Sequence, residues 1–176
     1  MSSTTRILAF PDQTDYSTSR QPLPAFAADL RSGVETFERS HTAARRASEQ
    51  FCRFTDIWPD QCERLEAALS GLIIAVQKLC NLFDDFAVLP QSVVSIRYQL
   101  IVALHHLKDQ LQNIAVKVRA LRPICRTDRR QTDKQRYEIQ LKLPDLVKRS
   151  DQLHYEVHAL LDRARFLEQT LLRETA

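Results

Sequence analysis

The fold is decided by residues 93–121, which read VVSIRYQLIVALHHLKDQLQNIAVKVRAL. Apolar residues recur there in alternating steps of four and three, and a single polar residue, Arg97, interrupts the series. Because this spacing keeps one apolar seam on one face of an α-helix, the stretch predicts a long amphipathic helix over about 93–122. Pro123 disfavours helical geometry at Arg122 and is expected to end the helix. The positions of the seam are Val93, Arg97, Leu100, Leu104, Leu107, Leu111, Ile114, Val118 and Leu121.

Two stretches nearer the N-terminus show the same spacing. Residues 24–54 and 61–88 are each expected to form a long helix, because their apolar residues mostly recur in steps of three or four. A breaker at residues 55–59 separates them, Asp60 is placed to cap the second helix, and Pro90 ends it. The inward positions are Phe26, Leu30, Val34, Phe37, Ala44, Ala47, Phe51 and Phe54 in the first helix, and Cys62, Leu65, Leu69, Leu72, Ile73, Val76, Leu79, Leu82, Phe83 and Phe86 in the second.

The beginning of the last helix is marked less sharply in the sequence than the beginnings of the other three. We expect it from Pro144 onward, because proline suits the first turn of a helix and the apolar spacing continues to Leu171. Residues 124–143 form a polar, basic connection that is either a loop or, in its second half, helical. The last helix is therefore expected to be kinked or interrupted at Pro144.

The composition agrees with a helical domain. Only 2 of 176 residues are glycine, which argues against sheet-rich folds and against glycine-rich phosphate loops. Short connections between long helices favour antiparallel neighbours, so residues 23–176 are predicted to form an all-α, up-down-up-down four-helix bundle. An extended coiled coil with a partner chain is the structural alternative, because the seams are nearly heptad. Residues 1–22 are polar and predict a disordered or loosely docked tail. Ile7–Phe10 within it are either pinned on the domain or a docking motif.

The sequence also favours a soluble, intracellular protein. No run approaches the roughly 20 apolar residues of a membrane span, and the N-terminus lacks a secretory signal. Four cysteines occur without CxxC spacing and are expected to be free thiols of a reducing compartment. Cytoplasm and nucleus are not distinguished, and no membrane contact is expected.

The expected topology gathers positive charge at one end of the bundle. The connection between the first two helices and the connection before the last helix should lie together there. Only Asp128 and Asp133 oppose the cations, so this end is expected to be basic and to contact an acidic partner, phosphate or nucleic acid. The alternative is a solvated loop in which Trp58 covers the end of the bundle. The candidate binding residues are Trp58, Arg119, Arg122, Arg126, Arg129 and Arg130, with Ile57, Pro59, Lys134 and Arg136 nearby.

One short motif carries possible chemistry. In Leu104-His105-His106-Leu107-Lys108 a helical histidine is followed by leucine at plus two and lysine at plus three. This segment resembles the phosphorylation motif of histidine phosphotransfer domains, which are four-helix bundles. The resemblance implies that His105 would accept a phosphoryl group and that Lys108 would help neutralise it. Asp109 stands where that family usually has glycine, and a histidine at the edge of the buried face is the alternative interpretation.

Metal chemistry has weaker support in the sequence. His154 and His158 are one helical turn apart and could form a metal-binding pair, but no third ligand is evident from the sequence. Cys52, Cys62 and Cys125 gather at the basic end without a nearby histidine. No metal site and no cofactor are therefore expected.

The functional expectation follows from long seams without a catalytic constellation. We expect a non-enzymatic module for protein–protein interaction, such as an adaptor, a scaffold subunit or an effector-like bundle. It would bind another chain, or a second copy of itself, through its helices and its basic end. Histidine phosphotransfer through His105 is one alternative, and binding of nucleic acid or phosphate at the basic end is another.

Overall fold

The computed structural model of the chain describes residues 22–53, 58–85 and 91–174. These residues form four α-helices and no strand: α1 (Pro22–Arg53), α2 (Pro59–Asp85), α3 (Gln91–Ile124) and α4 (Arg129–Glu174). The predicted all-α, four-helix fold is confirmed. The predicted N-terminal tail spans residues 1–22. Of these, only Pro22, the first residue of α1, is among the described residues.

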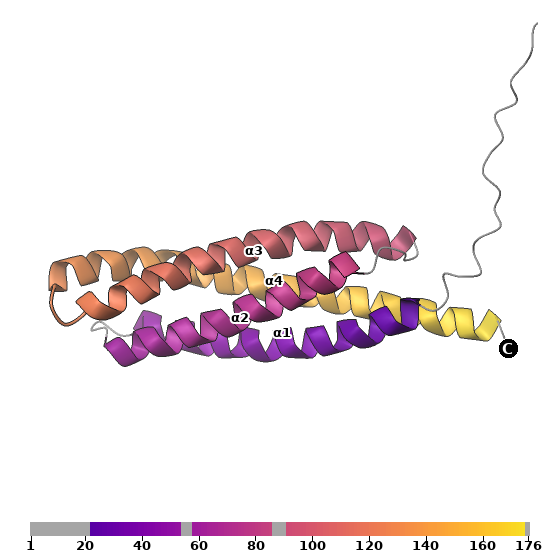
Figure 1. Cartoon of the computed structure of the whole chain (residues 1–176), viewed down its shortest axis with the longest axis horizontal. Helices are drawn as coiled ribbons and strands as arrows, with labels where there is room; N and C mark the ends of the chain where they lie inside the picture. The colour runs from indigo at the N-terminus through magenta and orange to yellow at the C-terminus, as the bar shows by residue number, and fades with distance from the viewer. Residues whose placement is uncertain (1–21, 54–57, 86–90, 175–176) are drawn as a thin grey trace, which may run out of the picture.

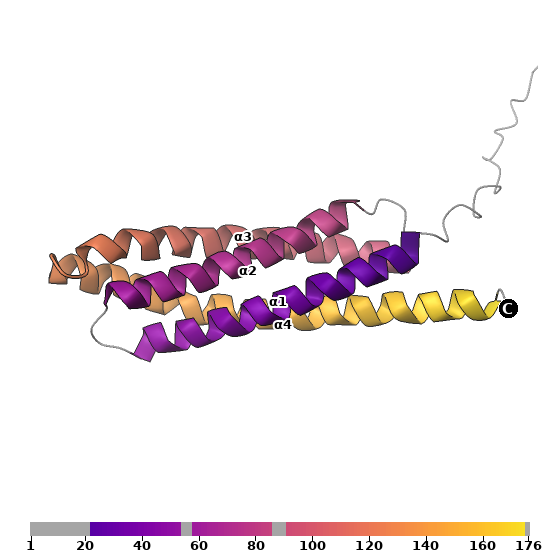
Figure 2. The ribbon, with the colours of Figure 1, turned by 60° about the horizontal axis from the view of Figure 1, so that its bottom comes forward.

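The helices lie side by side in an elongated bundle. Helix α1 packs against α2 and α4, and α3 packs against the same two helices. In Figure 1 the chain runs in opposite directions along consecutive helices, so each helix is antiparallel to the next. Helix α4 is the longest, with 46 residues or about 69 Å at 1.5 Å per residue, and Figure 2 shows it running along the length of the bundle.

Most of the inward positions predicted from spacing are buried in the core. Ala47, Ile73 and Leu82 are partly buried, and Phe54 and Phe86 lie outside the described residues. The apolar positions of the α3 seam are buried from Val93 through Leu107 to Leu121, whereas Arg97 is half-buried. Phe26 of α1 packs against Phe83 of α2, with 6.3 Å between ring centroids. Four polar side chains are buried among the apolar ones: His41, Ser48, Thr132 and Ser150. Each of the four makes a hydrogen bond, as expected for polar groups removed from water.

Local signals at the start of α2 differ from the predicted cap. The helix begins at Pro59, whose fixed φ suits a first helical position. The residue before it, Trp58, acts as the N-cap, and its backbone N–H donates to Gln61 Oε1 at 3.2 Å, as in one half of a capping box. The prediction that Asp60 caps this helix is therefore wrong, since Asp60 lies inside the first turn.

Of the two alternatives for residues 124–143, the loop is wrong, and the helical one, in which this segment extends the last helix through Pro144, is confirmed from Arg129 onward. Helix α3 includes Pro123 in its last turn and ends at Ile124, and α4 already begins at Arg129. The backbone N–H of Gln131 donates to Asp128 Oδ1 at 2.9 Å, which makes Asp128 the N-cap of α4. Thr132 then joins the two helices, because its buried hydroxyl donates to the carbonyl oxygens of Ile124 and Asp128.

Helix α4 continues through Pro144 without a break, so an interrupted last helix is wrong. Proline has no N–H to donate, and the carbonyl of Gln140 four residues earlier loses its helical partner. Pro144 is exposed, and water can hydrogen-bond to that carbonyl on the outer side of the helix. The side chain of Gln140 in turn donates to the carbonyl oxygen of Phe51 at 3.2 Å and ties α4 to the end of α1.

Helices α1 and α2 approach each other closely at Gly33. A Cβ atom built on Gly33 would lie 2.8 Å from Cδ2 of Leu79, closer than real Cβ contacts allow. Gly71 on α2 has no such neighbour within 4 Å. A side chain at position 33 would therefore force the buried Leu79 side chain to shift, whereas one at position 71 would meet no neighbour.

Helix α2 is long and apolar enough, by length and composition, to cross a membrane. In the bundle it packs against α1 and α3, and nine of its residues are buried. Core packing therefore accounts for the apolar face of this helix.

Candidate functional site

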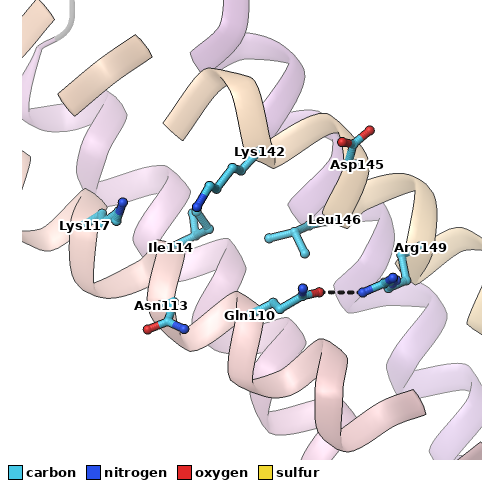
Figure 3. A pocket seen from close by; sticks show the side chains of 8 residues that line it. All are labelled: Gln110, Asn113, Ile114, Lys117, Lys142, Asp145, Leu146 and Arg149. Atoms are coloured by element: carbon cyan, nitrogen blue, oxygen red, sulfur yellow. Dashed lines mark hydrogen bonds between the residues drawn. The ribbon is translucent and has the colours of Figure 1, made fainter. Parts of the chain in front are cut away.

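An open groove of about 610 Å³ lies between α3 and α4 (Figure 3). Its floor is apolar, with Ile114 from α3 and Leu146 from α4, both buried. Figure 3 shows the Leu146 side chain and the Lys142 ammonium group directed into the cavity, and the Asp145 carboxylate directed away from its centre. The remaining walls are Gln110, Asn113, Lys117 and Arg149.

Hydrogen bonds hold the guanidinium group of Arg149 at one end of the groove. Its Nη1 donates to Gln110 Oε1 at 2.7 Å and to His106 Nδ1 at 3.0 Å, both on α3. Neither acceptor is anionic, so the positive charge of Arg149 is not neutralised by these contacts. Lys142, on the opposite wall from Gln110, makes no ion pair within the described part of the chain.

At the other end of the groove Lys117 donates to Glu138 Oε2 at 3.0 Å. This hydrogen bond and the lysine's charge lower the pKa of Glu138. Two cations, Lys142 and Arg149, thus stand against the single carboxylate Asp145, and the groove is positive.

Exposed apolar side chains form a stripe on each of the two helices beside the groove. The α3 stripe contains Tyr98, Val102 and Val116, and the α4 stripe contains Tyr137, Leu141 and Tyr155; Ile96 of α3 is also exposed but lies off this line. Within each stripe the steps are four and fourteen residues, and fourteen residues are about 3.9 turns, so each set lies on one outward line. Phe166, about three turns beyond Tyr155, extends the α4 stripe.

The contacts across the groove fix the register of the two stripes. Because Lys117 pairs with Glu138 and Gln110 with Arg149, Val116 lies roughly level with Leu141, and Val102 lies roughly level with Tyr155. Along the helix axes the positive groove therefore lies between two exposed apolar pairs, of which Tyr155 also contacts His154 on the α1 side of α4, with 5.7 Å between ring centroids. These pairs are about 21 Å apart along the helices, at 1.5 Å per residue. We call this surface the α3–α4 face.

The predicted basic end is assembled in part. The Arg126 guanidinium lies 6.0 Å from the centroid of the exposed Trp58 ring, so the two connections do meet. However, Arg119 donates to Glu66 at 2.6 Å, and Arg122 lies 3.5 Å from Glu63. The expectation that only Asp128 and Asp133 oppose the cations is therefore wrong, since α2 supplies two carboxylates. Arg126, Arg129 and Arg130 are exposed, and Ile57 lies outside the described residues.

The side chains of the histidine phosphotransfer motif have different surroundings and neighbours. His105 is half-buried. The Lys108 Nζ donates to Gln77 Oε1 on α2 at 2.9 Å, so its ammonium group is engaged with α2. Asp109 is exposed. His106, next to the motif histidine, belongs to the α3–α4 groove through its contact with Arg149.

The histidines of α1 and α4 gather on the other side of α4, at the α1–α4 interface. His154 lies parallel to His41, with 6.2 Å between ring centroids and 10° between planes, and edge-on to His158 at 4.9 Å. Potential ligand atoms of Glu38, His154 and His158 all lie within 4.8 Å of one another. The sequence offered no third ligand for the His154–His158 pair, because Glu38 comes from a helix whose register against α4 the sequence does not specify.

His41 is the buried member of this group. Its Nδ1 lies 3.0 Å from Ser150 Oγ, and its Nε2 lies 3.2 Å from Asp151 Oδ1 without the alignment of a well-formed hydrogen bond. Burial lowers the pKa of His41 below its ordinary value, and the Asp151 carboxylate opposes that shift in part. Phe37 packs against both His41 and His154.

The four cysteines are free thiols. Burial raises the pKa of Cys62 and of Cys80 to about 11, and it also raises the pKa of Cys52. Cys125 Sγ donates to the carbonyl oxygen of Arg122 at 3.0 Å. Because their pKa values are raised, the thiols of Cys52, Cys62 and Cys80 are held as neutral packing groups and are poor nucleophiles at neutral pH.

Comparison with protein-family models, with curated proteins and with solved structures finds no match for this chain.

Proposed function

We propose that this chain is a non-enzymatic protein–protein interaction module and that the α3–α4 face is its binding surface for a helix of another protein. The observation that carries the proposal is the pairing of two exposed apolar stripes with a positive groove between them. Large apolar side chains cost free energy when they face water, and exposed apolar side chains that accompany a groove are typical of an interaction surface.

The chemistry of the face selects the partner. Val102 and Tyr155 at one end, and Val116 and Leu141 at the other, offer apolar contacts about 21 Å apart. Between them the groove presents positive charge. The complementary ligand is an amphipathic helix with apolar residues about fourteen positions apart and with carboxylates on the same face between them.

A second copy of the chain fits this face less well than an acidic partner does. A symmetric pairing through the α3–α4 face would bring Lys142 and Arg149 of one copy near the same cations of the other. Like charges brought together at an interface cost free energy. The basic end is a smaller candidate surface, because Glu63 and Glu66 neutralise two of its arginines.

A designed peptide tests the proposal. The probe is a helical peptide of about twenty residues with two leucines fourteen positions apart and three glutamates on the same face between them. Binding is measured by fluorescence anisotropy of the labelled peptide against the full chain. We expect saturable binding that weakens with added salt, since part of the attraction is electrostatic. A matched peptide with glutamine in place of glutamate is expected to bind more weakly.

Variants of the chain locate the contact. Val102→Glu and Lys142→Glu are each expected to weaken peptide binding at least about tenfold, because they place a carboxylate against an apolar or acidic part of the peptide. The control is Ile74→Glu on α2, whose side chain is 57% exposed, against 56% for Val102. Equal affinity for all three variants and the parent chain would refute the proposal.

A further inference from the structure

The geometry points to a binding site for one divalent transition-metal ion of the zinc class, held by Glu38 of α1 and by His154 and His158 of α4. The site lies at the α1–α4 interface and uses no residue of the α3–α4 face. The Tyr155 ring of that face contacts His154 edge-on, with 5.7 Å between centroids, but the two proposals are tested by variants of different side chains, so either can fail without the other.

The spacing of the ligands fits such an ion. Histidines at i and i+4 on one helix face are a recurring zinc-binding pair, and a carboxylate from a neighbouring helix completes a set of three protein ligands. In a tetrahedral zinc site with bonds of about 2.1 Å, ligand atoms lie roughly 3.4 Å apart. The ligand atoms of the three groups are within 4.8 Å of one another. Side-chain rotations that move these atoms by about 1 Å bring them to that separation. Glu38 is exposed and free to make such a rotation.

One atom of the cluster lacks a partner. His154 Nε2 is buried and has no hydrogen bond within the described residues. Buried polar atoms in folded proteins are nearly always paired, and an exception calls for an explanation such as a bound ion. A metal bond to an imidazole of this pair would compensate for the lost contact with water.

The surroundings fix the orientation of the ligands. The His154 ring packs against Phe37 and His41, at 6.1 and 6.2 Å between centroids, and lies edge-on to His158 and Tyr155. His41 itself is engaged with Ser150 and Asp151, so it supports the site rather than completing it. Two histidines and one carboxylate leave a fourth position open on the exposed side of Glu38, for water or for a side chain of a partner.

The test uses the full chain after treatment with a chelator. Zn²⁺ is titrated in competition with a chromophoric chelator, and Co²⁺ is added separately because its visible absorption reports the ligand set. We expect one ion per chain. At about a hundredfold excess over the dissociation constant, Zn²⁺ is expected to raise the thermal midpoint by roughly 5–10 °C. Mg²⁺, which prefers oxygen ligands, is expected to produce no shift.

Two ligand variants and one matched control decide the outcome. Glu38→Gln and His158→Gln are each expected to weaken zinc binding at least about tenfold, whereas Glu35→Gln, one turn away on the same helix and also exposed, is expected to leave it unchanged. Circular dichroism confirms that each variant is folded. Three results would overturn the inference: no binding of Zn²⁺ by the parent chain, equal binding by the ligand variants, or a Co²⁺–thiolate charge-transfer band that places the ion at the cysteines.

Discussion

Replacing each of the two glycines with alanine tests the packing of α1 against α2. Alanine is favoured over glycine inside a helix by about 0.5–1 kcal/mol. At Gly71 the added methyl group meets no atom within 4 Å, so Gly71→Ala should realise the full gain. For an unfolding slope of about 2.5 kcal/mol per molar urea, the urea midpoint should rise by about 0.3 M.

At Gly33 the same substitution should have the opposite sign. The new Cβ would lie 2.8 Å from Leu79 Cδ2, and Leu79 is fully buried. Forcing a methyl group into a filled core costs about 1–3 kcal/mol, which exceeds the helix-propensity gain. Gly33→Ala should therefore destabilise the chain by about 1 kcal/mol, measured by urea unfolding followed by circular dichroism.

A second background separates steric overlap from other causes. In Leu79→Val the Cδ methyl groups are absent, so Gly33→Ala should lose most of its cost there, and the double-mutant cycle should show coupling between the two positions. Gly71→Ala should be unaffected by the same background. If Gly33→Ala stabilised the parent chain as much as Gly71→Ala does, α1 and α2 would not approach each other as described.

Three further predictions address the helix cap, the thiols and the phosphotransfer motif. Asp128→Ala should lower the free energy of unfolding by about 1 kcal/mol, because it removes the N-cap of α4; an unchanged urea midpoint would contradict the capping assignment. With pKa values of about 11, Cys62 and Cys80 are almost wholly neutral at pH 7.5, so mass spectrometry should find iodoacetamide on Cys125 well before it finds it on either of them. Incubation with a phosphorylated receiver domain should leave no acid-labile phosphate on the chain. If the parent chain acquired such phosphate and the His105→Gln variant did not, the chain would instead be a phosphotransfer protein.

Spacing alone predicts the part of the fold that depends on burial. Leu100, Leu104, Leu107 and Leu111 follow one seam, and all are buried, because any packing of a long helix must cover its apolar face. The start of α4 is harder to predict, since proline favours a first turn and Pro144 offered one. The residue that caps the start of α4 is Asp128, whose side chain accepts a hydrogen bond from the backbone N–H of Gln131. This N-cap allows a helix to begin in a segment whose polar composition is typical of a loop.

The candidate sites could not be predicted in the same way, because they depend on register between helices. The sequence provides no means to align Glu66 with Arg119, or Glu38 with His154, although each pair meets in the bundle. The α3–α4 groove depends on the same alignment. Tyr137 and Leu141 lie in the segment for which the sequence leaves loop and helix open, so the sequence does not place them on one helical line with Tyr155.

The central claim, that the α3–α4 face binds an acidic amphipathic helix, is tested most directly by mapping where the designed peptide lies. In a nuclear magnetic resonance titration of the ¹⁵N-labelled chain, the account predicts amide shift changes concentrated in residues 98–117 of α3 and 137–155 of α4, with little change in α1 and α2. Shift changes centred on α1 and α2, or on the basic end around Trp58 and Arg126, would contradict it.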